Sequence, residues 1–194
     1  MLRLVKYSLL MFLLVSFIFI GCAKPGHPGQ AGNSASADTK SISIAQPHFV
    51  FLRNIGSQDL SKFNSPVGVA VDSENNLYVS DFGNSLIKKY DAQGNFITQW
   101  GGEGILWGKF SIVGELFIDK NDSIYVADIG NGRIQKFDKN GRLMKIIGVG
   151  KLKHPRSVAV DETGIIYVID EFGNQVVKFD ANGNYIKSWG SEGL

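Results

Sequence analysis

An internal repeat constrains this chain more than any other feature, because every copy of the repeat must fold in the same way. Three segments align, at 65–101, 111–148 and 154–190. Each contains two aspartates nine positions apart, a third Asp ten positions later, and a Gly three positions after that. The first aspartates of the units, Asp72, Asp119 and Asp161, are 47 and 42 residues apart. The difference in spacing falls in the loop 101–111.

Each unit contains four short strand-like runs separated by turn residues, which favours antiparallel strands over helices. The turn between the last two runs has Asp first and Gly fourth, as in Asp91–Gly94. This order is typical of a type I turn that is followed by a left-handed residue. Four antiparallel strands in a repeat of this length predict the blades of a β-propeller. In the first unit the runs are Val67–Val71, Leu77–Val79, Leu86–Tyr90 and Phe96–Trp100.

The units resemble the NHL-repeat family at two segments in particular, 66–72 (PVGVAVD) and 128–138 (DIGNGRIQKFD). The resemblance covers about Phe49 to Leu194 and implies a propeller of usually six blades. Three complete units, at about 63–101, 110–148 and 152–190, follow one strand-like run, Phe49–Gly56. We therefore expect residues 49–194 to form an all-β, partial six-bladed propeller of three complete four-stranded blades plus one N-terminal strand.

The N-terminal region predicts export and a lipid anchor. Two basic residues precede the apolar run Tyr7–Ile20, whose 14 residues are too few to span a bilayer and are typical of a signal peptide. Gly21-Cys22 then resembles a bacterial lipobox, so residues 1–21 are interpreted as a lipoprotein signal peptide and Cys22 as the lipid attachment site. The alternative is an ordinary signal peptide with an incidental cysteine. Ala23 after the cysteine resembles Gram-negative sorting patterns, so in a Gram-negative host the outer membrane of the cell envelope is favoured.

Residues 22–48 are rich in Ala, Ser, Gly and Pro and lack aromatic residues, which predicts a flexible, lipid-anchored tether. Cys22 is the only cysteine, which excludes an internal disulfide framework. Apart from Arg3 and Lys6, the chain has 18 basic and 18 acidic residues. This balance argues against nucleic-acid binding, because affinity for phosphates needs an excess of Lys and Arg.

The repeats contain no recognisable catalytic arrangement. Amidating lyases related to the NHL family hold zinc through several histidines, whereas this repeat region has His154 alone, and a zinc site needs at least three protein ligands. Asp119, Asn121 and Ser123 imitate the start of a calcium loop, but Ile124 stands where Gly is required. We therefore expect hairpin turns at these positions and no catalytic residue, metal or cofactor.

Three functions are compatible with these features. The leading hypothesis is a non-enzymatic envelope lipoprotein whose propeller is a protein- or ligand-binding platform. The alternatives are a metal-dependent lyase or hydrolase, and a truncated propeller without independent function. Trp107, in the longest inter-blade loop, and Phe51 are the candidate interface residues, because Trp and other aromatic residues are favoured at interfaces. The alternative for Trp107 is that it folds back on its own blade.

An arc of three blades leaves one apolar face of each end blade uncovered, and such faces indicate an absent partner. We therefore expect self-association or a second propeller-forming chain. The expected assembly is a symmetric dimer of three-blade halves that exchange the Phe49–Gly56 strand or an end-blade face.

Overall fold

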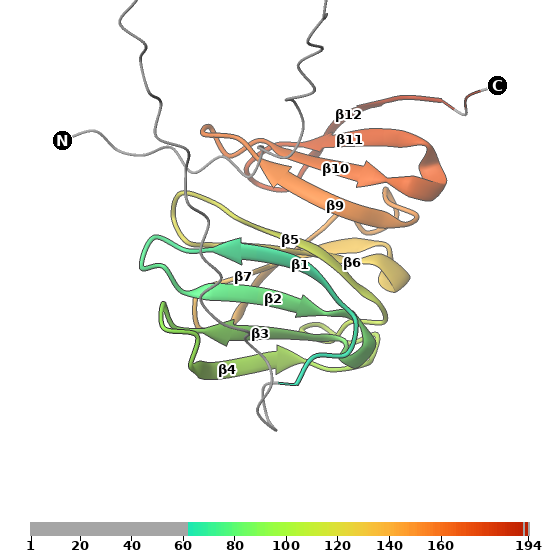
Figure 1. Ribbon diagram of the computed structural model, residues 1–194. Helices are drawn as coiled ribbons and strands as arrows, with labels where there is room; N and C mark the ends of the chain where they lie inside the picture. Colours follow the sequence, from blue (N-terminus) through green and yellow to red (C-terminus); the bar gives the residue numbers. More distant parts are fainter. Residues whose placement is uncertain (1–61, 192, 194) are drawn as a thin grey trace, which may run out of the picture. The chain divides into compact units, whose positions relative to one another are not determined.

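The computed structural model describes residues 62–191 and 193 of this chain. Within them, three four-stranded antiparallel sheets follow one another along the sequence, which confirms the all-β prediction (Figure 1). We call them the first, second and third blades. The predicted signal peptide, the tether and the run Phe49–Gly56 lie outside the described residues. Within the described residues, no helix is long and apolar enough to cross a membrane.

Each blade takes its strands in sequence order, so neighbouring strands are joined by hairpins. The first blade contains β1 (Pro66–Val71), β2 (Leu77–Asp81), β3 (Leu86–Tyr90) and β4 (Phe96–Gly101). The second contains β5 (Val113–Ile118), β6 (Ile124–Asp128), β7 (Arg133–Phe137) and β8 (Leu143–Ile147). The third contains β9 (Pro155–Val160), β10 (Ile166–Asp170), β11 (Gln175–Phe179) and β12 (Tyr185–Trp189).

The three blades are held together by two apolar layers, one at each junction. Between the first and second blades, Tyr78 and Ile87 pack against residues of the second blade that include Phe137. Between the second and third blades, Ile134 packs in a cluster with Val168. The second blade therefore buries apolar side chains on both of its faces, as a blade inside a propeller does.

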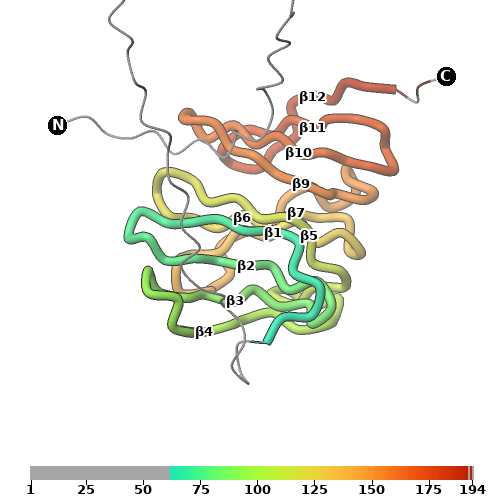
Figure 2. Tube along the Cα trace, viewed as in Figure 1, coloured from blue at the N-terminus to red at the C-terminus, as the bar shows by residue number. Residues whose placement is uncertain are grey.

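The innermost strands β1, β5 and β9 lie side by side, so that the blades crowd together along this line (Figures 1 and 2). Gly68 shows how close the approach is. A Cβ atom at Gly68 would lie 2.6 Å from Oγ of Ser80 and 3.1 Å from Cα of Glu115 on β5. The absence of a side chain at this position is therefore required by the packing of β1 against β5.

The turns have the chemistry that the repeat predicts. In the third turn of the first blade, Oδ1 of Asp91 accepts hydrogen bonds from the backbone N–H groups of Gln93 at 2.9 Å and Asn95 at 2.8 Å. Gly94 has a φ of 75°, in the left-handed region. The first turns use the same device: Asp119 accepts hydrogen bonds from the backbone N–H groups of Asn121 and Ser123. These aspartates therefore close hairpins, as expected.

A second kind of turn joins the two middle strands of each blade. β2, β6 and β10 each end on a fully buried Asp, which is followed by a single 3-10 turn. The turns are η2 (Phe82–Asn84), η3 (Ile129–Asn131) and η4 (Glu171–Gly173), and each ends on a left-handed residue. The buried carboxylates, from Asp81, Asp128 and Asp170, accept hydrogen bonds from the segment that enters their own blade. In each blade, the segment before the first strand is thus hydrogen-bonded to the end of the second strand.

Candidate functional site

The loop between β4 and β5 carries three consecutive exposed apolar side chains, Ile105, Leu106 and Trp107, which we call the apolar tip. The side chain of Trp107 is 76% exposed, so it does not fold back on its own blade. The segment from Gly148 to β9 is five residues shorter than the segment from Gly101 to β5, as the repeat spacings of 47 and 42 require, and it carries Val149 in place of the tip. The apolar tip is therefore an addition to the repeat.

A buried carboxylate lies beneath the apolar tip. Asp128, at the end of β6, accepts hydrogen bonds through Oδ2 from Nε of Arg133 at 2.7 Å and from Nε2 of Gln135 at 2.9 Å. Its Oδ1 accepts the backbone N–H of Ser111 at 3.1 Å, and Nδ2 of Asn131 donates to both oxygens. Hydrogen bonds to an ionised group are roughly twice as strong as neutral ones, so Asp128 fixes the orientation of these donors.

The oriented donors in turn hold the loop backbone. Nη2 of Arg133 donates to the carbonyl oxygens of Leu106 at 2.8 Å and Lys109 at 3.1 Å. Nε2 of Gln135 donates to the same carbonyl of Lys109 at 2.6 Å, and its Oε1 accepts the N–H of Gly108 at 2.8 Å. The backbone around the tip is therefore hydrogen-bonded to buried side chains of β7.

This arrangement displays apolar side chains on an ordered support. A partner that binds an ordered loop does not have to supply the free energy of ordering it, which favours affinity. Trp is the residue type most enriched among those that dominate binding energy. The chemistry of the apolar tip is therefore suited to docking against an apolar surface of another molecule.

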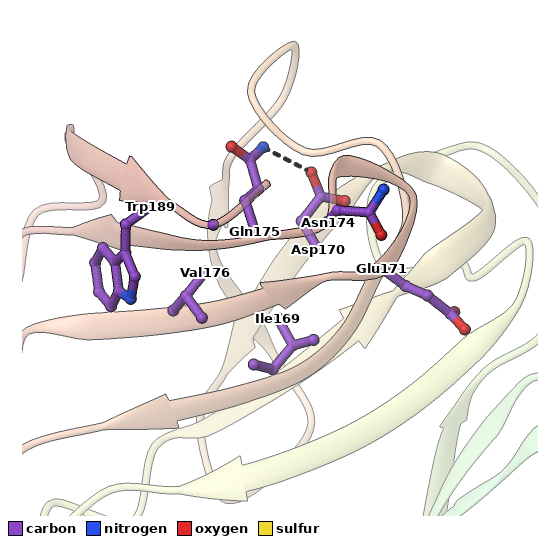
Figure 3. Close-up of a pocket in the computed structure, with 8 residues that line it drawn as sticks. Ile169, Asp170, Glu171, Asn174, Gln175, Val176 and Trp189 are labelled. Carbon is purple, nitrogen blue, oxygen red and sulfur yellow. Dashed lines mark hydrogen bonds between the residues drawn. The ribbon is translucent and has the colours of Figure 1, made fainter. Parts of the chain in front are cut away.

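A second feature lies on the outer face of the third blade, where a pocket of about 370 Å³ is lined by residues of β10, η4, β11 and β12 (Figure 3). Ile169, Val176 and Trp189 form its apolar side. At the other side, Nε2 of Gln175 donates to Oδ2 of the buried Asp170 at 3.1 Å. The pocket is thus mainly apolar and open to solvent on the face turned away from the second blade.

The largest upward shifts in pKa occur at buried tyrosines. Burial raises the pKa of Tyr90 to about 12, and the negative charge of Asp81 adds to the effect. Burial also raises the pKa of Tyr78, and Asp72, which accepts the hydrogen bond of its hydroxyl at 3.0 Å, raises it further. These phenols stay protonated near neutral pH, so they act as hydrogen-bond donors and packing groups.

The other residues singled out from the sequence are placed as follows. Cys22 and Phe51 lie outside the described residues. Nδ1 of His154 lies 3.0 Å from Oε2 of Glu171, and its ring stacks on Phe172 with centroids 3.9 Å apart. His154 therefore has the contacts of an ordinary loop residue. Among residues 62–191 and 193, no group of three or more His, Cys, Asp or Glu side chains could hold a metal ion.

Comparison with known proteins identifies the repeat. The family model for the NHL repeat matches residues 63–90, which contain β1, β2 and β3. The chain contains an NHL repeat. The second and third blades continue it with the same strand order and turns. A search of curated proteins found no significant match to the sequence.

The three blades are similar to solved propeller structures. A protein of unknown function from Bacteroides caccae shares 14% identity and a TM-score of 0.52 over 63% of this chain. A catalytically inactive virginiamycin B lyase from Staphylococcus aureus with Quinupristin shares 17% identity and a TM-score of 0.55 over 66% of this chain. The hydrazine synthase of Kuenenia stuttgartiensis shares 12% identity and a TM-score of 0.56 over 73% of this chain. The chain spans 48%, 42% and 40% of these structures, and the likeness concerns the fold alone. The fold is a partial β-propeller.

The sequence analysis missed the groups beneath the apolar tip of this propeller segment. Arg133 and Gln135 have counterparts of different chemistry in the other two units, Leu86 and Lys88 in the first. The signal that could have identified them was present, because the one unit with this pair of long hydrogen-bonding side chains also follows the longest loop. The sequence could not show that the pair reaches the loop.

Proposed function

We propose that this chain is a non-enzymatic protein-binding platform of the cell envelope, held at a membrane by lipid on Cys22. The apolar tip would be the part of the platform that contacts the partner. The observation that carries this proposal is the exposure of three consecutive apolar side chains on a loop whose backbone is hydrogen-bonded to buried groups. Adjacent exposed apolar side chains that form a patch often mark interaction sites on folded proteins.

The membrane anchor rests on the sequence of the N-terminal region. The short apolar run, the Gly21-Cys22 pair and the aromatic-free segment that follows are the parts that a lipoprotein needs, in the required order. In this proposal the tether 22–48 gives the propeller reach above the membrane surface, so that the apolar tip can meet a partner in the envelope.

Site-specific photo-crosslinking in intact cells tests the proposal. A photoreactive amino acid at Trp107 is expected to give a discrete crosslinked protein adduct. The matched control carries the same group at Val149, which is also exposed and lies in the corresponding loop between the second and third blades. No adduct at Trp107, or the same adducts at both positions, would contradict the proposal.

Affinity measured with the isolated partner gives the contribution of Trp107 to the binding free energy. Trp107→Ala should weaken binding by about 2 kcal/mol, which is roughly 30-fold in Kd, because Trp side chains at interfaces often contribute this much. Metal analysis of the purified chain separates the platform from a metal-dependent lyase or hydrolase. Zinc or calcium bound in a one-to-one ratio would favour the enzyme.

A further inference from the structure

The outer face of the third blade exposes positions that are buried in the other two blades. Trp189 is 46% exposed, whereas its counterpart in the second blade, Ile147, is buried. Ile169 is 47% exposed, whereas its counterparts Ser80 and Ala127 are fully buried. Tyr167 and Val176 show the same difference less strongly. We call Tyr167, Ile169, Val176 and Trp189 the third-blade face.

The pocket on the third-blade face is filled at the other two positions of the repeat. In the first blade the corresponding place, beside Gly101, is occupied by Phe110, and a Cβ atom at Gly101 would lie 2.7 Å from its ring. In the second blade the place beside Gly148 is occupied by Leu152. Both side chains are buried and come from the blade that follows. The pocket beside Gly190 is therefore a socket of the repeat, without its inserted side chain.

The inserted side chain comes from a fixed position in each unit. Phe110 and Leu152 both stand three residues before the first strand of their own blade, and the next residue donates its backbone N–H to the buried Asp of that blade. Phe63 stands at the same position of the first blade. The backbone N–H of Asn64 accordingly donates to Oδ1 of Asp81 at 2.6 Å.

Phe63 also makes the intra-blade contact of its counterparts. Its ring lies 5.7 Å from that of Tyr90, and the ring of Phe110 lies 5.9 Å from that of Phe137. Phe110 is fully buried, whereas Phe63 remains partly exposed. The first blade thus presents the side chain that a preceding blade would receive.

Two positions on β1, at the first blade's outer face, repeat this relationship. Val69 is 64% exposed, whereas its counterparts Leu116 and Val158 are 7% and 5% exposed in the two junctions. Val71 is exposed as well. We call Phe63, Val69 and Val71 the first-blade face. Parts of the junction that the chain builds twice internally are therefore exposed a third time, with one half at each end of the described stack.

We propose that the third-blade face of one copy binds the first-blade face of a second copy, with Phe63 of the second copy entering the socket beside Gly190. A second contact at the internal junctions supports this pairing of the two faces. Within the chain, the third-turn Gly141 packs against the ring of Trp100, and Gly183 packs against Ile147. In the proposed contact, the equivalent Gly94 would receive Trp189.

The contact is head-to-tail, because it joins two different faces. Each copy carries one of each, so two copies that form both contacts close a ring, and a ring of two copies is the symmetric dimer expected from the sequence. The apolar tip takes no part in this contact, so the inference is independent of the proposed platform function.

Complementation between two blocked variants tests the inference. Ile169→Glu places a charge on the third-blade face, and Val69→Glu places one on the first-blade face. Each variant of the full chain, in detergent, should sediment as a monomer, whereas the wild type should sediment as a dimer. An equimolar mixture should form a one-to-one complex, because one head-to-tail contact remains intact. The expected loss of affinity in each single variant is at least tenfold.

Ile186→Glu is the matched control. Ile186 is exposed on β12, and its counterparts Ile97 and Met144 are exposed in the other blades, so the repeat does not bury this position. This variant should remain a dimer, and so should Trp107→Ala. Far-UV circular dichroism spectra that match that of the wild type would show that all variants fold. A monomeric wild type, or a mixture that fails to associate, would overturn the inference without affecting the test at Trp107.

Discussion

At the scale of single residues, Asp128 has the largest effect on the candidate site. Its carboxylate is fully buried and receives the guanidinium of Arg133, which is itself almost fully buried. Two buried opposite charges stabilise each other only while both are present, because an unpaired buried charge has lost its hydration without compensation. The support of the apolar tip therefore depends on one side chain of the neighbouring strand β6.

Asp128→Asn is expected to lower the free energy of unfolding by about 3 kcal/mol, because it leaves the charge of Arg133 buried without a counter-charge. Chemical denaturation measures the change. Hydrogen exchange should also speed up at Gly108, whose N–H is bonded to Gln135. Glu162→Gln, on an exposed turn, is the control and should change stability by less than about 0.5 kcal/mol. A stability loss of that small size in Asp128→Asn would mean that the ion pair contributes little.

At the scale of elements, the hairpin turns depend on ionised aspartates. Burial would raise the pKa of Asp72, but hydrogen bonds from Asn76, Tyr78 and Glu74 outweigh it and lower the pKa below its ordinary value. Asp161 closes the matching turn of the third blade and Asp180 closes that blade's third turn, and hydrogen bonds from Thr163 and Asn184, respectively, lower their pKa values. The same local chemistry therefore recurs at the two ends of the stack.

The lowered pKa of Asp72 predicts the direction of a pH effect. Because the pKa is lower in the folded chain than in the unfolded chain, where it is about 3.9, ionised Asp72 stabilises the fold above that pH. The contribution is lost as the pH falls through the folded-state pKa. Asp72→Asn keeps an acceptor for the turn but cannot titrate, so its melting temperature should fall less than that of the wild type between pH 5 and pH 3. Parallel acid dependence in the two proteins would contradict this explanation.

At the scale of the whole molecule, the three blades form a stack in which each blade contacts only its neighbours. The second blade is covered on both faces by the clusters around Phe137 and Ile134. Within the described residues, the first and third blades each have a single junction, and the association proposed above joins their outer faces. Stability of such an arrangement grows with the number of junctions, and self-association would add to it.

Anchoring is also a property of the whole molecule. We expect thioether lipidation at Cys22, so metabolic labelling with a radioactive fatty acid should mark the wild-type chain and leave Cys22→Ser unlabelled. The variant should also keep its signal peptide, because the lipoprotein peptidase requires the modified cysteine. Labelling of Cys22→Ser at the wild-type level would refute the anchor. Its propeller should melt at the same temperature as the wild-type propeller, since Cys22 lies outside the repeat units.

The sequence by itself determined the strand order, the turn types and the number of blades within the described residues. These features depend on short-range chemistry, such as an Asp and a Gly at fixed spacing around a turn, and repetition makes the pattern unambiguous. It also indicated Trp107 as an unusual residue, because nothing in the other units corresponds to it.

Only the tertiary structure showed what lies beneath and beside these elements. Arg133 and Gln135 reach the loop around Trp107 because β7 passes below it, which no local pattern encodes. The pairing of Phe110 and Leu152 with sockets on the preceding blade likewise depends on the distance between blades. Contacts of this kind join residues far apart in sequence through side-chain packing, so they appear only when the blades are stacked.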